Sequence, residues 1–139
     1  MSHSVFLVAS IGAPRNHHAI FVETDPSSRG GIVLQVTGNI QAGMEFEERH
    51  AENPETADGF VGKTCLGEVK VGDLDRLREI CRRNPAPKKQ FDVPRRLYPT
   101  EALRRCQEWT AETIELLSKE GVLLVSGSAG AQAPVKESE

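Results

Sequence analysis

Cys106 has the surroundings that thiol chemistry requires. It lies in the segment RRCQEWT, directly after two arginines, on what the spacing predicts to be a helix from Thr100 to about Glu120. Nearby cations and the free N–H groups of a helix N-terminus both favour a thiolate. A thiol nucleophile also needs a base, and a predicted strand upstream carries two adjacent histidines. One interpretation of Cys106 is therefore a nucleophile for acyl transfer.

A second interpretation of Cys106 is structural. One face of the same predicted helix carries this cysteine with apolar or small residues: Leu103, Thr110, Ile114 and Leu117. A free cysteine on such a face is usually a small buried hydrophobe. A helix that begins at Thr100 would also place the thiol in the second turn, where the influence of the helix dipole fades. Both interpretations stay open at this point.

The elements that must position Cys106 follow from the periodicity of the chain. Runs rich in β-branched and apolar residues predict five strands, at residues 4–10, 17–23, 32–38, 44–50 and 64–71. The period then changes, and helical spacing appears at residues 73–83 and 100–120. Strands followed by helices favour an α+β fold, in which an antiparallel sheet packs against two main helices.

Length and composition indicate one domain over residues 1–126, followed by a small and polar tail at 127–139 that we expect to be disordered. No apolar run has the length of a transmembrane helix, and the start of the chain lacks the basic region of a signal peptide. We therefore expect a cytoplasmic protein with reduced thiols. The cysteines have no zinc-site spacing, so no metal and no cofactor are expected.

Charge is unevenly distributed along the chain. Residues 76–105 hold ten Lys or Arg against three acids, although the net charge of the whole chain is −3. The ordinary interpretation is a solvated basic face balanced by an acidic one. The alternative is that this segment serves Cys106 or contacts a partner. We expect no nucleic-acid binding, because the isoelectric point is about 5.8 and no aromatic residues interleave with the bases.

Three short segments stand in a suggestive order: HHAIFV at residues 17–22, LQV at 34–36 and RCQEWT at 105–110. Together they resemble the permuted papain-like proteins of the NlpC and lecithin:retinol acyltransferase type, in which a histidine strand, a polar residue and a cysteine helix follow one another. The chain is also similar to small uncharacterised fungal proteins with HWALFV and RCQEWT segments. The resemblance implies a circularly permuted papain-like fold over about residues 4–118.

The same resemblance implies a catalytic set of Cys106 as nucleophile, His17 as base and Gln35 as the group that orients the imidazole. His17 and His18 must point to opposite faces of a strand, and the match assigns the base to His17. A packed or surface position is the alternative for His18. Two positions depart from the pattern. That group often has His at the position of Gln35, and it has Asn at the position of Arg105, directly before the cysteine. The candidates for substrate binding are His18, Arg104, Arg105 and Trp109.

The function implied by the resemblance is that of a small cytosolic thiol-dependent hydrolase or acyltransferase, acting on a small-molecule or peptide acyl substrate. The alternative is a catalytically altered domain that keeps the groove and binds a ligand or a protein. A third possibility is an interaction domain that uses the basic segment 76–105 as its contact surface. The distance between Cys106 and His17 in the fold bears most directly on this choice.

Overall fold

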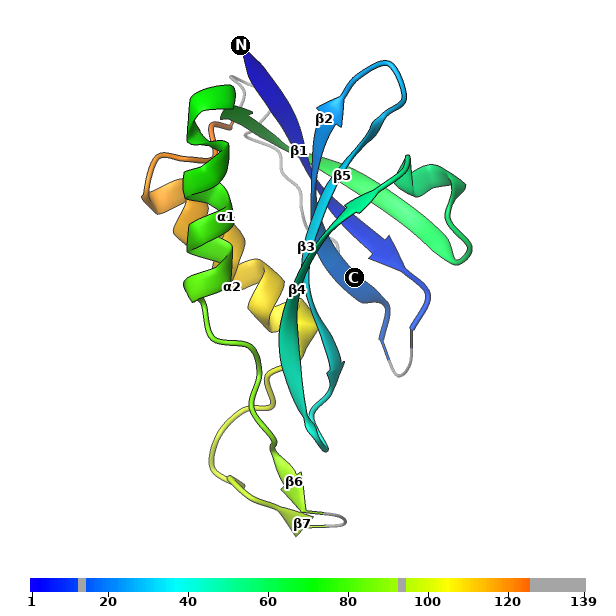
Figure 1. The fold of residues 1–139 in the computed structure, drawn as a ribbon. Helices are drawn as coiled ribbons and strands as arrows, with labels where there is room; N and C mark the ends of the chain where they lie inside the picture. Colours follow the sequence, from blue (N-terminus) through cyan, green and yellow to red (C-terminus); the bar gives the residue numbers. More distant parts are fainter. Residues whose placement is uncertain (13–14, 93–94, 126–139) are drawn as a thin grey trace.

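A five-stranded antiparallel sheet, in the order β4-β3-β2-β1-β5, forms the centre of the computed structural model, which describes residues 1–12, 15–92 and 95–125. Its strands are β1 (Ser2–Ser10), β2 (His17–Asp25), β3 (Gly30–Asn39), β4 (Gly43–Ala51) and β5 (Phe60–Lys70). Two helices, α1 (Leu74–Arg83) and α2 (Cys106–Lys119), pack against the sheet (Figure 1). The expected α+β fold is confirmed. The expected disorder of residues 127–139 lies outside the described residues.

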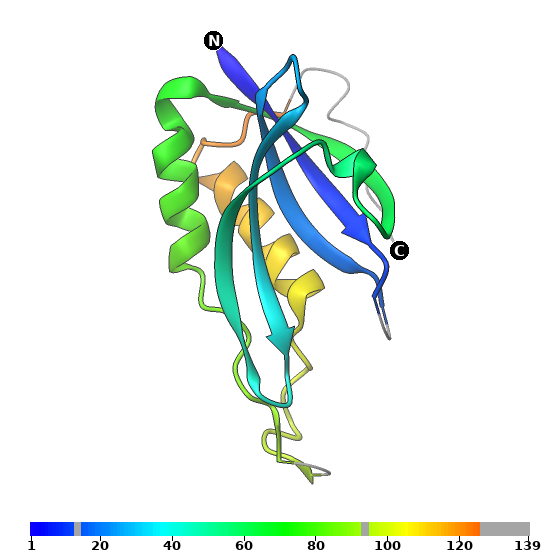
Figure 2. The ribbon, with the colours of Figure 1, turned by 45° about the vertical axis from the view of Figure 1, so that its right-hand side comes forward.

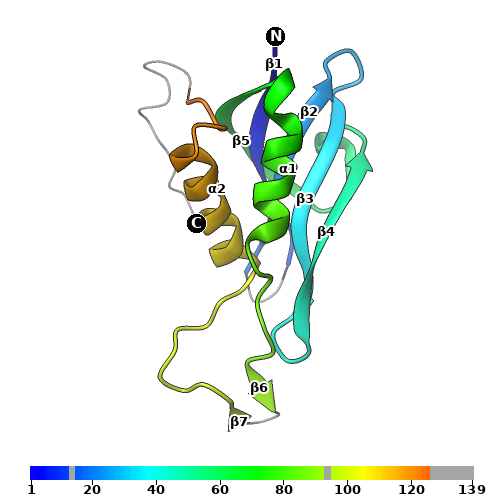
Figure 3. The ribbon, with the colours of Figure 1, turned by 60° about the vertical axis from the view of Figure 1, so that its left-hand side comes forward.

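The two helices lie side by side on one face of the sheet (Figure 3). On this face, alternate strand residues such as Ile20 and Leu34 pack with Leu77, Trp109 and Leu117 in the main core. A second cluster on the other strand positions contains Val8, Ala19, Phe21 and Val33. Because side chains alternate along a strand, His17 falls on the side of Ala19, and Gln35 falls on the side of Val33. The sheet therefore presents the His17 and Gln35 side chains on the same face.

The turn between β3 and β4 sets the register on which the site depends. The side-chain oxygen of Asn39 accepts hydrogen bonds from the N–H groups of Gln41 and Ala42 at 3.0 and 2.9 Å. Such local bonds are the reason that asparagine is frequent in turns. In the hairpin that follows, Gln35 pairs directly with Glu47. The register places these two side chains next to each other on one face of the sheet.

The second helix begins later than the sequence predicts, at Cys106 and not at Thr100. The cause is the buried side chain of Gln90, which is 6% exposed. Its Oε1 accepts from the N–H of Arg104, and its Nε2 donates to the carbonyl of Arg104, both at 2.8 Å. These two hydrogen bonds to the backbone of Arg104 have the pattern that a neighbouring β-strand would make. The backbone of Arg105 is extended, with φ −122° and ψ −170°. Cys106 is consequently the first residue of α2.

The linker between the helices is fastened to the β3–β4 hairpin. The N–H of Gln90 donates to the carbonyl of Ile40 at 2.7 Å, and the N–H of Met44 donates to the carbonyl of Pro87 at 2.8 Å. Figure 2 shows the hairpin running down to this linker. The linker has little regular structure, as its prolines predict: its strands β6 (Phe91–Asp92) and β7 (Arg95–Arg96) pair only with each other and project beyond the sheet (Figure 1).

Two short 3-10 turns, η1 (Pro54–Thr56) and η2 (Val71–Asp73), precede β5 and α1. The segment after α2 pairs with β5 through a single antiparallel bridge between Glu68 and Leu124. Gly67 is required at this contact, because a Cβ there would lie 2.3 Å from the carbonyl oxygen of Leu124. The end of the described chain is thus attached to the edge of the sheet.

Replacing Gln90 with Ala should lower the free energy of unfolding by about 1–3 kcal/mol, since the N–H and C=O of Arg104 would both lose their partner in a partly buried place. Urea unfolding followed by circular dichroism measures this change. Gln41→Ala is the matched control, because the Gln41 side chain is exposed and has no hydrogen bond to the described residues. Equal losses in both variants would contradict the role assigned to Gln90.

Candidate active site

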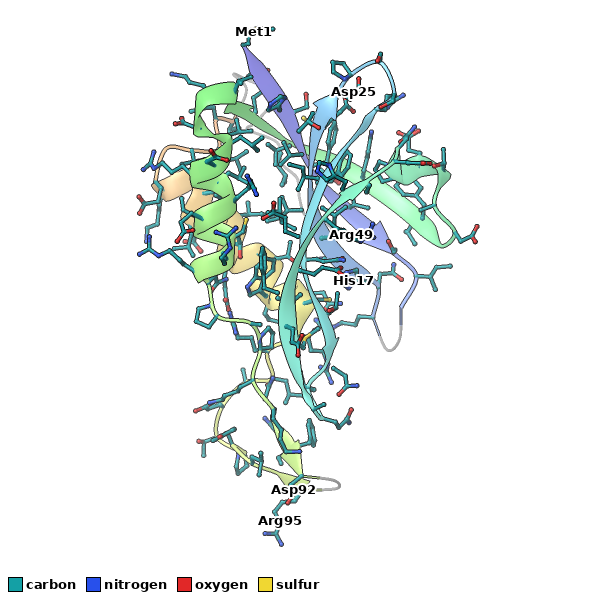
Figure 4. The ribbon with its side chains drawn as sticks, in the orientation of Figure 1. Met1, His17, Asp25, Arg49, Asp92 and Arg95 are labelled. Carbon is teal, nitrogen blue, oxygen red and sulfur yellow. The ribbon has the colours of Figure 1, made fainter. Side chains whose placement is uncertain are left out.

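Cys106 lies at the N-terminus of α2, where unpaired backbone N–H groups and the helix dipole favour an anion. Figure 4 shows His17 on the sheet close to this end of the helix. Burial is the largest single influence on the pKa of Cys106 and raises it. Hydrogen bonds from the His17 side chain and the His18 backbone, with the positive charges of His17 and Arg15, outweigh burial, so the pKa lies below its ordinary value.

The pKa of His17 moves in the opposite direction. Its hydrogen bond with Cys106 is the largest cause and raises the pKa, while burial opposes the rise. The hydrogen bond to Gln35 and the negative charges of Cys106 and Glu47 raise the pKa of His17 further. The two shifts favour the same state, in which the thiol has given its proton to the imidazole. The structure thus brings Cys106 and His17 together from positions far apart in the chain.

A chain of hydrogen bonds fixes the orientation of the His17 ring. The Gln35 amide nitrogen donates to Oε1 of Glu47 at 2.6 Å, and the Gln35 carbonyl oxygen lies 2.7 Å from Nε2 of His17. A carboxylate only accepts hydrogen bonds, so the amide nitrogen must face Glu47 and the amide oxygen must face His17. Nε2 of His17 therefore carries the hydrogen of this bond. In the neutral ring, Nδ1 is then the nitrogen that can accept the thiol proton.

A pocket of about 340 Å³ has Cys106 and His17 in its wall. Its other walls come from the loop before β2, from the turn between β3 and β4, and from the start of α2. A larger hollow of about 450 Å³ lies between α1 and α2, but no cysteine, serine or histidine of the described part of the chain lines it. The pocket that brings Cys106 and His17 together is the candidate active site.

Arg15 is held near the thiol by an ion pair. Its Nη2 donates to both carboxylate oxygens of Glu108 at 3.1 Å. Glu108 in turn accepts from the backbone N–H of Arg105 at 2.7 Å, as an acid in the first turn of a helix commonly does. Burial raises the pKa of Glu108, but these hydrogen bonds and the charge of Arg15 outweigh it and lower the pKa. The ion pair fixes a positive charge in the wall of the pocket.

Of the four residues expected to bind substrate, Arg105 lines the pocket and Trp109 does not. Trp109 is fully buried in the main core, where its ring lies 5.9 Å from that of Phe46. Its indole N–H donates to the carbonyl of Asn84 at 3.0 Å. The helix position of Trp109 points into the core, where its side chain packs α2 against the sheet, and the binding role expected of it stays a prediction.

Arg104 and His18 also lie outside the pocket wall. The guanidinium of Arg104 pairs with Glu112 at 2.7 Å and donates to the carbonyl of Pro85 at 2.7 Å, so it fastens α2 to the linker. His18 points to the opposite side of β2 from His17, and burial, followed by the charges of His17 and Arg15, lowers its pKa. His18 contributes through its backbone, which hydrogen-bonds to Cys106.

Sequence reasoning missed two charged residues of the site, Glu47 and Arg15. The signal for Glu47 was available, because two predicted strands joined by a short turn must pair as a hairpin, and that pairing places Gln35 opposite Glu47. The signal for Arg15 was its position two residues before His17. The bond of Arg15 to Glu108 joins residues 93 positions apart, and no local pattern predicts it.

The other two cysteines provide a contrast with Cys106. All three are free thiols. Cys81 is fully buried in the main core, and burial, with the charge of Glu48, raises its pKa to about 12. Cys65 is exposed on β5. Cys81 is therefore unsuited to thiolate chemistry, and Cys65 serves as an accessible reference thiol.

Within the described residues, histidines, cysteines and carboxylates nowhere gather in a group of three that could hold a metal ion. Among the helices described, none is long and apolar enough to cross a membrane.

The chain belongs to DUF6540, a family of unknown function whose profile matches residues 5–124. The matched range contains the whole candidate site, from Arg15 to Glu108. No curated protein and no solved structure matches the chain.

Replacing Glu47 with Gln should slow the alkylation of Cys106 by iodoacetamide several-fold near neutral pH. The variant removes a negative charge that raises the pKa of His17, and it no longer forces the Gln35 oxygen toward the ring. Peptide mass spectrometry of the alkylated protein measures the rate at each cysteine. Glu45→Gln is the control, as an exposed carboxylate on the same strand. If the two variants behave alike, the hydrogen-bond chain does not support His17.

Proposed function

We propose that this protein is a small cytosolic thiol-dependent hydrolase or acyltransferase, with Cys106 as nucleophile, His17 as general base and Gln35 as the orienting group. One observation carries the proposal. Cys106 lies at a helix N-terminus and is hydrogen-bonded to His17, and Nε2 of the His17 ring is hydrogen-bonded to the Gln35 side chain. A nucleophile, a base within reach of it and a third group that orients the base are the signature of covalent catalysis.

The order of elements supports a circularly permuted papain-like architecture as part of this proposal. The histidine strand β2 precedes the cysteine helix α2 in the chain, and the helix packs against β2 and β3 with its first residue beside the histidine. Gln35 takes the place where the related group commonly has a second histidine. The carboxylate of Glu47 behind it supplies the negative charge that an amide lacks.

The reaction follows from the geometry. Nδ1 of His17 accepts the proton of the Cys106 thiol, and the thiolate sulfur attacks the carbonyl carbon of an acyl substrate. The resulting oxyanion accepts hydrogen bonds from the free N–H groups at the start of α2, including that of Cys106. The bond to the leaving group then breaks, and His17 gives its proton to that group. A thioester on Cys106 and a neutral imidazole remain.

In the second half of the reaction, His17 takes a proton from water or from another acceptor nucleophile. The activated oxygen or nitrogen attacks the thioester carbonyl, the bond from carbon to sulfur breaks, and the acyl product leaves. The sulfur departs as a thiolate and the imidazolium is restored, so the pair returns to its starting state. Water as the acceptor gives hydrolysis, and an amine or alcohol gives acyl transfer.

One observation favours a second candidate, a ligand-binding domain that has lost the chemistry. Cys106 is only 6% exposed, which is low for a residue that must reach a carbonyl carbon. In this alternative the pocket binds an acyl compound or a peptide, and Cys106 takes part only as a packed thiol. The two candidates differ in whether an acyl group is ever transferred to the sulfur.

Incubation of the protein with a series of p-nitrophenyl esters of small acids distinguishes the thiol enzyme from the ligand-binding domain. We expect a burst of p-nitrophenol and an acyl adduct that intact-protein and peptide mass spectrometry locate at Cys106. Cys106→Ser should abolish the thioester, and His17→Ala should slow acylation by about 100-fold or more, the usual contribution of a general base. Cys65→Ser is the control and should leave the burst unchanged. An adduct at Cys65, or none at all, would refute the proposed activity.

The pH dependence of Cys106 alkylation tests the same pair. Reactivity should persist below the pH at which an ordinary cysteine loses it, because the folded protein lowers the pKa of Cys106. It should be lost as the pH falls through that lowered pKa and the thiolate is protonated. His17→Ala removes the imidazolium and its hydrogen bond, so the profile should move to higher pH. A profile that is the same in both proteins would exclude His17 as the partner of the thiol.

A further inference from the structure

We infer that the substrate of this site is an anionic acyl compound, one that carries a carboxylate or phosphate group which Arg105 and Arg15 bind beside Cys106. The inference rests on the proposed function and names the substrate class of the same pocket. It follows from three observations: the positive charge of the pocket wall, the difference between arginines near the thiol that form ion pairs and the one that forms none, and the position of the pocket at a helix N-terminus.

The wall of the pocket is more basic than the chain that forms it. Among the described residues, this wall contains Arg15, Arg105 and His17, and it contains no aspartate or glutamate. The whole chain has more acids than bases, with 20 Asp or Glu against 17 Lys or Arg. A concave site lined by one sign of charge attracts ligands of the opposite sign and raises their local concentration. The pocket wall therefore selects for negative charge.

Arg105 has the clearest capacity to bind a ligand. Arg105 is a half-buried residue of the pocket wall, and among the described residues its guanidinium forms no ion pair and no hydrogen bond. The adjacent Arg104, which is outside the wall, is bound to Glu112 and to the carbonyl of Pro85. A guanidinium offers five N–H donors in a fixed plane that matches a carboxylate or a phosphate. Arg105 therefore has donors available for a ligand of the pocket that Cys106 also lines.

Arg15 supplies a second positive charge, and only part of its guanidinium is hydrogen-bonded within the protein. Both of its bonds to Glu108 come from Nη2, so Nε and Nη1 have no partner among the described residues. Glu108 divides its carboxylate between Arg15 and the N–H of Arg105, and it does not reach the pocket wall. The ion pair therefore positions Arg15 without placing a competing negative charge in the pocket. Free N–H groups at the start of α2 add to the same positive field.

The arginines have a second possible effect, which the test must separate from the first. The charge of Arg15 lowers the pKa of Cys106 and so increases the thiolate fraction for every electrophile. Attraction of an anionic substrate acts only on reagents that carry negative charge. Iodoacetate and iodoacetamide have the same leaving group and nearly the same size, and they differ in charge. The ratio of their rates at one cysteine cancels the thiolate fraction.

The experiment measures both alkylation rates at Cys106 and at Cys65 of the folded full-length chain, near neutral pH and at low ionic strength, by peptide mass spectrometry. The iodoacetate to iodoacetamide ratio at Cys106 should exceed that at Cys65 by about fivefold, as one pair of charges in contact gives even in water. Arg105→Gln should remove most of this excess, and the double variant with Arg15→Gln should remove all of it. High salt should also reduce the excess.

Arg76→Gln is the matched control, because Arg76 pairs with Glu120 at the other end of α2 and does not line this pocket. It should leave the ratio at Cys106 unchanged. If Cys106 reacts faster than Cys65 with iodoacetamide but shows no preference for iodoacetate, the substrate inference is overturned and the proposed function stands. If Cys106 reacts with neither reagent, the proposed function fails, and the substrate inference fails with it.

Discussion

The side-chain amide of Gln90 determines that Cys106 is the first residue of α2. Buried in the linker, it pairs with both backbone groups of Arg104 and so delays the start of α2 until Cys106. The backbone of Gln90 is bonded at the same time to Ile40 in the β3–β4 turn. One residue thus ties together the linker, the hairpin and the beginning of the helix. With α2 one turn longer at its start, the thiol would lie inside the helix and away from its free N–H groups.

The rest of the candidate site is supported by regular structure. His17, Gln35 and Glu47 come from three neighbouring antiparallel strands, and the alternation of side chains places them on one face of the sheet. A shift of one residue in the pairing of β3 with β4 would turn Gln35 or Glu47 to the other face and break the hydrogen-bond chain. The precision of the proposed site therefore comes from strand register, while a loop residue, Arg15, adds charge.

The pair of Gln35 and Glu47 gives a physical account of a departure from the permuted papain-like proteins that the sequence resembles. A glutamine can orient an imidazole through its carbonyl oxygen, but it brings no charge of its own. The Glu47 carboxylate fixes which end of the amide faces His17, and its charge also raises the pKa of the imidazole. In the proposed mechanism, two side chains together perform the orienting and electrostatic roles that a single ionisable group performs elsewhere.

The sequence by itself determined the order of strands and helices, since the change from strand-like to helical periodicity is local and strong. It also indicated Cys106, His17 and Gln35 as a set, through three short segments. It could not determine the start of α2, because residues 100–105 have helical character that the distant Gln90 overrides. Only the tertiary structure decided that Trp109 and Arg104 belong to the packing of α2, that Arg105 faces the pocket, and that Arg15 reaches Glu108 across 93 positions. Contacts of that range depend on how the helix is laid against the sheet, and no pattern of neighbouring residues encodes them.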